Sequence, residues 1–86
     1  MIKVFVAPKC NLCEPIKEQL DTGAVTPPYG YYDVSTPEGM AEAAMYGVMG
    51  TPTVISSNGV KHFGQEAVDI ISQMASRSAP PLSESS

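Results

Sequence analysis

Two cysteines, Cys10 and Cys13, stand where a strand-like segment meets a helix-like one. Residues 2–6, which are apolar except for Lys3, precede them, and the residues that follow show helical spacing. Thiols at positions i and i+3 of a first helical turn lie on one face and can close a small disulfide. The free N–H groups and partial positive charge of a helix N-terminus favour thiolate over thiol, which makes Cys10 the candidate nucleophile. Lys9 adds a positive charge that should favour the thiolate further.

The length and charge of the chain restrict its class. Its 86 residues allow one small domain, which we expect over residues 1–77, whereas the Ser- and Pro-rich residues 78–86 should form a disordered tail. A formal charge of −4, with only five Lys and Arg, argues against nucleic acid and anionic membranes as partners. The apolar runs are far shorter than the ~20 residues that span a bilayer. With no signal-peptide pattern before the first strand, we expect a cytoplasmic location. We also expect the protein to be a monomer.

The first strand should cover residues 2–6 and end before Pro8. The helical pattern starts at Cys10 or Asn11 and continues to Thr22-Gly23, with Lys17 on its polar side, opposite the apolar stripe. Pro15 implies that this helix begins later than Cys10 or bends there, because proline is tolerated only in the first turn. A second strand is predicted over 29–34, where Gly30 indicates a bulge or a sheet edge.

The second half of the chain repeats this alternation. A helix is expected from Pro37 to about Tyr46, capped by Ser35 or Thr36. Residues 48–55 contain a third strand, and a turn at 57–59 leads to a fourth strand over 60–63 that should pair with it in antiparallel orientation. A third amphipathic helix is predicted over 65–76. The order is β-α-β-α-β-β-α, an α/β fold in which the alternating strands are expected to be parallel and helices cover both faces of a four-stranded mixed sheet.

With a C-x-x-C after the first strand and Thr51-Pro52 before the third, the chain resembles the thioredoxin superfamily. The resemblance implies a thioredoxin-like fold and a cis peptide bond at Pro52, which would lie against the cysteine pair. Residues 46–54, with Asn58-Gly59 and Gly64, are similar to thioredoxins proper. The short length and early first strand resemble glutaredoxins instead. The resemblance covers roughly residues 2–76.

The chain also departs from these families. Lys9 stands where thioredoxins have tryptophan, and residues 2–6 offer no carboxylate to assist proton transfer. Asn11-Leu12 matches neither the Gly-Pro of thioredoxins nor the Pro-Tyr of many glutaredoxins. The glutaredoxin resemblance suggests that Lys9 and the Thr51 backbone could bind glutathione. However, glutaredoxins place a Gly-Gly and an acidic or hydroxyl pair before their last helix, and this motif appears here only as Gly64-Gln65-Glu66.

These residues predict a dithiol–disulfide oxidoreductase with no cofactor beyond its redox-active disulfide. Cys10 would attack a protein disulfide and Cys13 would resolve the mixed disulfide. The resemblance places Thr51 and Pro52 against the substrate, and Met49 could form an apolar rim. Thioredoxin reductase or glutathione would supply electrons, for electron transport and cell redox homeostasis.

Three alternatives stay open from the sequence. One is a glutathione-dependent glutaredoxin, and another is a binding module whose cysteines do not turn over. The third is a soft-metal carrier, because two thiolates in a C-x-x-C motif can hold Cu(I). A structural zinc site is not expected, because zinc prefers four ligands and the chain adds only His62 and scattered carboxylates to the pair.

Overall fold

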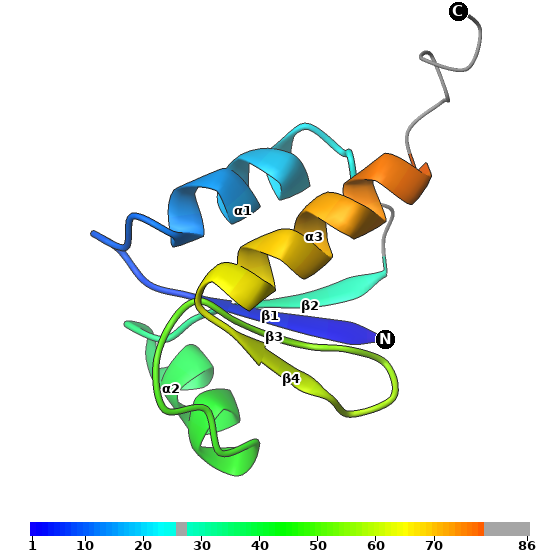
Figure 1. Ribbon diagram of the computed structural model, residues 1–86. Helices are drawn as coiled ribbons and strands as arrows, with labels where there is room; N and C mark the ends of the chain where they lie inside the picture. The colour runs from blue at the N-terminus through cyan, green and yellow to red at the C-terminus, as the bar shows by residue number, and fades with distance from the viewer. Residues whose placement is uncertain (26–27, 79–86) are drawn as a thin grey trace, which may run out of the picture.

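The computed structural model describes residues 1–25 and 28–78 (Figure 1). The predicted disordered tail lies outside these residues, except for Ser78, which ends the last helix. The order of elements is the one that the sequence predicts. In chain order they are β1 (Ile2–Val6), α1 (Cys13–Asp21), β2 (Tyr29–Asp33), α2 (Pro37–Met45), β3 (Thr53–Ile55), β4 (Lys61–Phe63) and α3 (Gln65–Ser78).

The four strands form one mixed sheet in the order β2-β1-β3-β4. β1 and β2 are parallel, and their register is continuous through Lys3 and Gly30, so Gly30 marks a sheet edge and not a bulge. β3 and β4 pair in antiparallel orientation, as predicted. The expectation of parallel alternating strands is wrong for β3, which runs antiparallel to β1. After β2, α2 and the loop 46–52 return the chain to the same end of the sheet, so β3 has to run back.

Helices cover both faces of the sheet, with α1 and α3 on one face and α2 on the other (Figure 1). Side chains alternate along a strand, so β1 sends Val4 and Val6 into one core and Phe5 into the other. The smaller core contains three buried residues, Phe5, Ala43 and Ile55. The larger core contains ten, Val4, Val6, Cys13, Ile16, Leu20, Val25, Val54, Ala67, Ile71 and Ala75.

Several element ends differ from the predicted ones. α1 begins at Cys13 and not at Cys10 or Asn11, so Pro15 occupies the third helical position, where its missing N–H is tolerated. β4 begins at Lys61, because the carbonyl of Val60 accepts the N–H of Ser56 (2.9 Å) and closes the hairpin turn. β2 ends one residue early, and α3 is two residues longer than predicted. Within the described ranges, no helix has the length and apolar character needed to cross a membrane.

The start of α2 is fixed by Thr36, one of the two predicted caps. Its hydroxyl oxygen accepts the N–H of Gly39 (3.0 Å) and donates to the carbonyl of Asp33 (2.7 Å). Pro37 follows as the first helical residue, also as predicted. Thr36 thus ties the first turn of α2 to the end of β2.

Replacing Thr36 with alanine should lower the free energy of unfolding by about 0.5–2 kcal/mol, since it removes the acceptor for a helix N–H group. Thr36→Ser keeps the hydroxyl and is the matched control, with an expected loss of well under half of that. Urea denaturation followed by circular dichroism measures both. Equal losses in the two variants would show that the hydroxyl does not cap the helix.

Candidate active site

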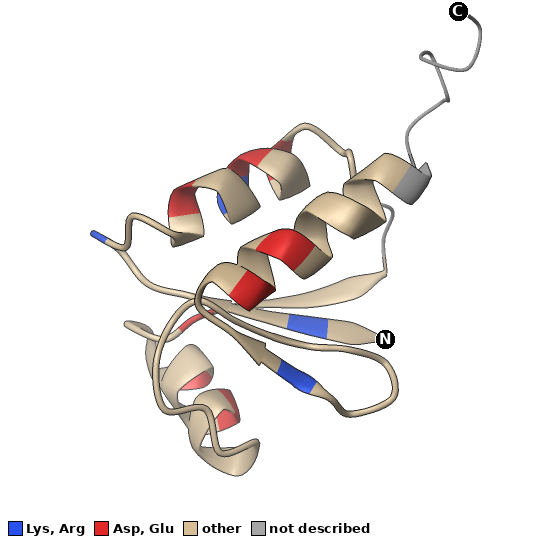
Figure 2. Ribbon diagram, in the orientation of Figure 1, with Lys and Arg blue, Asp and Glu red and all other residues tan. Residues whose placement is uncertain are grey.

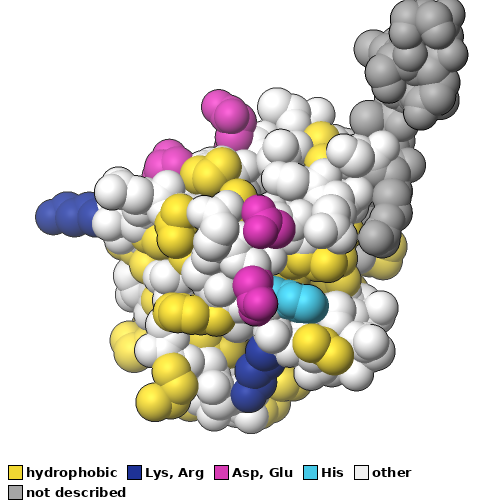
Figure 3. Space-filling view, viewed as in Figure 1, with side chains coloured by type: hydrophobic (Ala, Val, Ile, Leu, Met, Phe, Trp, Pro, Cys, Tyr) yellow, Lys and Arg dark blue, Asp and Glu magenta, His cyan; other side chains and the backbone are white. Residues whose placement is uncertain are grey.

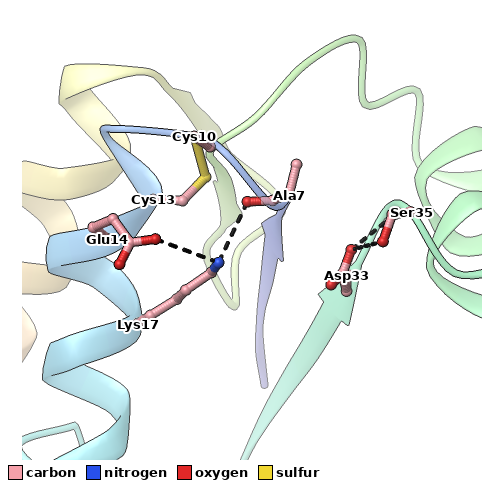
Figure 4. A network of polar contacts seen from close by, with 7 residues as sticks. All are labelled: Ala7, Cys10, Cys13, Glu14, Lys17, Asp33 and Ser35. Carbon is pink, nitrogen blue, oxygen red and sulfur yellow. Dashed lines mark hydrogen bonds and ion pairs between the residues drawn. A yellow bond between two sulfur atoms is a disulfide. The ribbon is translucent and has the colours of Figure 1, made fainter.

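The loop between β1 and α1 carries a disulfide between Cys10 and Cys13 (Figure 4). Their Cα atoms are 5.2 Å apart, and the N–H of Cys13 donates to the carbonyl of Cys10 (3.1 Å). Cys13 is the first residue of α1, and its exposed fraction is 0%, within the larger core. Cys10 is only half-buried. An incoming thiolate or disulfide can therefore reach Cys10, whereas Cys13 is shielded.

Lys9 lies exposed in this loop, immediately before the disulfide. Its backbone is in the left-handed region, with φ of 58°, which few residues other than glycine adopt. Figure 2 shows the tip of this loop, before α1, as a blue segment. The charge is thus presented to solvent beside Cys10.

Thr51 and Pro52 lie at the end of the sheet from which the cysteine loop departs. Thr53 pairs with Phe5 in the register of β3 and β1, which places Pro52 beside the end of β1. The Thr51–Pro52 peptide bond is cis, and Pro52 is fully buried. The N–H of Gly64 donates to the carbonyl of Pro52 (3.0 Å). This hydrogen bond ties the loop before β3 to the start of α3.

An apolar groove of about 320 Å³ runs between α2 and the loop that follows it. Met49, on its wall, is 97% exposed, and Thr51 also lines the groove. Figure 3 shows apolar side chains gathered over this corner of the molecule. The lining residues are Val34, Met40, Ala43, Ala44, Val48, Met49, Gly50 and Thr51. Two of the predicted substrate-contacting residues therefore share one wall of a groove.

Lys17 is a site residue that the sequence interpretation missed, because its position was assigned to the polar side of α1. Its side chain is only 26% exposed, and its Nζ donates to the carbonyl of Ala7 (3.4 Å). The same ammonium pairs with the Glu14 carboxylate at 3.7 Å. Figure 4 shows the ammonium between Glu14, on α1, and Ala7, at the end of β1, in the same view as the disulfide. The sequence signal that could have identified Lys17 is its position four residues after Cys13, which puts the two residues on the same helix surface.

Carboxylates surround this side of the site. The hydroxyl and the N–H of Ser35 both donate to Asp33 Oδ1 (2.6 and 2.8 Å) and hold the pKa of Asp33 below its usual value, with a smaller contribution from the Lys17 charge. Partial burial raises the pKa of Tyr31, and the charges of Asp33, Asp21 and Glu14 raise it further. Lys17 is therefore a cation within an acidic neighbourhood.

Over residues 1–25 and 28–78, no group of three or more His, Cys, Asp or Glu side chains is arranged to hold a metal ion. A Cu(I) ion bound by the two cysteine sulfurs alone would not require such a group. Metal analysis thus remains part of any test of this site.

Residues 1–75 match the family model described as "Thioredoxin domain". The thioredoxin-like protein BC3987 is similar in structure, with a TM-score of 0.60 and 25% sequence identity, over 86% of this chain and 99% of that one. The target protein XcR50 from X. campestris shares the fold, with a TM-score of 0.50 and 17% identity over 93% and 100% of the two chains. No curated protein sequence matches the chain. A cysteine pair at disulfide distance in this fold fits a thiol–disulfide oxidoreductase.

Proposed function

Because the chain belongs to the thioredoxin-domain family, we propose that it is a dithiol–disulfide oxidoreductase that reduces disulfides in other proteins. The observation that carries this proposal is the unequal burial of two bonded sulfurs. Cys10 is half-buried, whereas Cys13 is 0% exposed. This asymmetry suits one sulfur that meets the substrate and another that acts only within the protein.

The reaction proceeds by two thiol–disulfide exchanges. The Cys10 thiolate attacks one sulfur of the substrate disulfide, so that a mixed disulfide forms and the first substrate thiolate leaves with the bonding electron pair. Cys13 then loses its proton and attacks Cys10, which breaks the mixed disulfide and releases the second substrate thiolate. Each substrate thiolate takes up a proton. The substrate is reduced by two electrons, and the protein is left with the Cys10–Cys13 disulfide.

The substrate chain is proposed to lie across the loop that precedes β3. Thr51 would offer its backbone, Pro52 would support that contact from below, and Met49 would cover an apolar substrate side chain in the adjoining groove. Lys9 would meet an acidic group at the other side of Cys10. The electron donor is either a thioredoxin reductase or glutathione, in a reducing compartment such as the cytoplasm.

A redox titration of the purified protein against glutathione buffers, with mass spectrometry of alkylated thiols, tests the proposal. We expect a two-electron transition near the potential of thioredoxin, ~−270 mV, without a stable glutathione adduct. A potential of ~−200 to −230 mV with glutathione bound to Cys10 would indicate a glutaredoxin instead. If no Cys10–Cys13 disulfide forms at any potential, the protein is neither a thioredoxin-like reductase nor a glutaredoxin. Cu(I) binding should then be measured.

A further inference from the structure

Lys17 keeps its charged side chain largely buried, which its position on α1 does not require. A lysine at the border of a buried helix face normally extends its ammonium into water. The Lys17 side chain is only 26% exposed and donates to the carbonyl of Ala7, at the start of the cysteine loop. The ammonium is thereby anchored at the N-terminal end of α1.

The direction of the Lys17 side chain brings this charge to Cys13. Residues at i and i+4 are neighbours on a helix surface, and helical side chains lean toward the N-terminus, over the preceding turn. Cys13 is that neighbour. Figure 4 shows the ammonium between Glu14, Ala7 and the disulfide. Cys13 belongs to the same apolar core cluster as Val4 and Val6 of β1.

We infer that Lys17 is a positioning residue that places its ammonium beside Cys13 and stabilises the Cys13 thiolate in the resolving step. The inference rests on the proposed function. Burial in an apolar core disfavours a thiolate, and a nearby positive charge opposes that effect. In the resolving step the Cys13 thiolate attacks Cys10, the bond between Cys10 and the substrate breaks, and the leaving substrate thiolate takes up the proton that Cys13 released.

Other charged groups act on the same ammonium. Glu14 pairs with it directly, from the same helix. Asp33, at the end of β2, interacts with it only through space, and Lys9 lies in the cysteine loop. α3, which packs against α1, carries Glu66 and Asp69, and both are exposed. Lys17 and Glu14 are the charged residues whose substitution should change the Cys13 thiolate most directly.

The test titrates Cys13 alone, in the 86-residue chain with Cys10→Ser. Serine at this position is neutral, as Cys10 is in the mixed disulfide. Thiolate absorbance and alkylation rate are followed against pH in this background, alone and with Lys17→Met, Lys17→Arg or Glu14→Gln added. Methionine keeps much of the apolar stem without charge, and arginine keeps the charge. Circular dichroism establishes that each variant is folded.

Lys17→Met should lower the ratio of Cys13 thiolate to thiol about tenfold at a given pH, the equivalent of one unit on the pH axis. Lys17→Arg should restore the ratio, and Glu14→Gln should raise it, because it removes the anion that offsets the ammonium. An unchanged ratio in folded Lys17→Met overturns the inference. If that variant does not fold, an unchanged ratio in Glu14→Gln does so. No substrate takes part, so the result is independent of whether the wild-type protein reduces a substrate disulfide.

Discussion

Replacing Cys10 with serine should lower the rate of substrate disulfide reduction by at least about a thousandfold, because the hydroxyl cannot replace the attacking thiolate. The half-buried Cys10 is the sulfur that an incoming disulfide can reach, since Cys13 is 0% exposed. The measurement is the reduction of a protein disulfide with a dithiol supplying electrons. If the wild-type protein shows no rate above that of the dithiol alone, the proposed activity is wrong.

Cys13→Ser is the matched variant, because it keeps the nucleophile and removes only the resolving thiol. It should accumulate a mixed disulfide between Cys10 and the substrate, visible by mass spectrometry as one adduct per chain. Cys10→Ser should form none. If the adduct appeared on Cys13 in the Cys10→Ser variant instead, the assignment of the two roles would have to be reversed.

Replacing Gly39 with alanine should destabilise the protein by about 3 kcal/mol or more, at the upper end of the usual cost of overpacking. A Cβ on Gly39 would lie well inside 3.0 Å of the carbonyl carbon and oxygen of Asp33, a separation that Cβ atoms essentially never show. These are backbone atoms at the end of β2, so α2 itself would have to move. Thermal and urea unfolding measure the loss, which corresponds to a decrease in Tm of more than ~10 °C.

Helix propensity alone predicts the opposite result. Alanine is favoured over glycine in a helix interior by about 1 kcal/mol, so Gly39→Ala would be stabilising without the clash. Ala41→Gly, on the exposed side of α2, provides the comparison and should cost only about 1 kcal/mol. A stabilised Gly39→Ala variant would mean that α2 does not approach β2 as closely as described.

The sequence predicted the elements and their order because their signals are local. Alternating β-branched residues in β1, the apolar spacing of α1 and the Thr36-Pro37 start of α2 each specify one segment. The location of the cysteine pair and of Thr51-Pro52 at one end of the sheet was expected from the family resemblance. The structure brings both to that end through the pairing of β3 with β1.

Features that depend on contacts between distant segments could not be read from the sequence. The direction of β3 depends on where α2 and the following loop deliver the chain, and nothing in residues 46–55 encodes it. The left-handed backbone of Lys9 carries no glycine signal. Lys17 was assigned to the polar side, opposite the apolar stripe, whereas its ammonium turns inward to the Ala7 carbonyl.

The two faces of the sheet carry cores of unequal size, so the elements on one face are held by more apolar contacts than the element on the other. Both cysteines belong to or pack against the larger cluster, whereas α2 contributes one buried apolar residue, Ala43, to the smaller one. Local opening costs least free energy where few apolar contacts hold an element. The two sulfurs are therefore held on the face of the sheet that has the larger core. Under the proposed function, we expect the wall of the groove that α2 provides to be the part that adjusts to substrates of different shape.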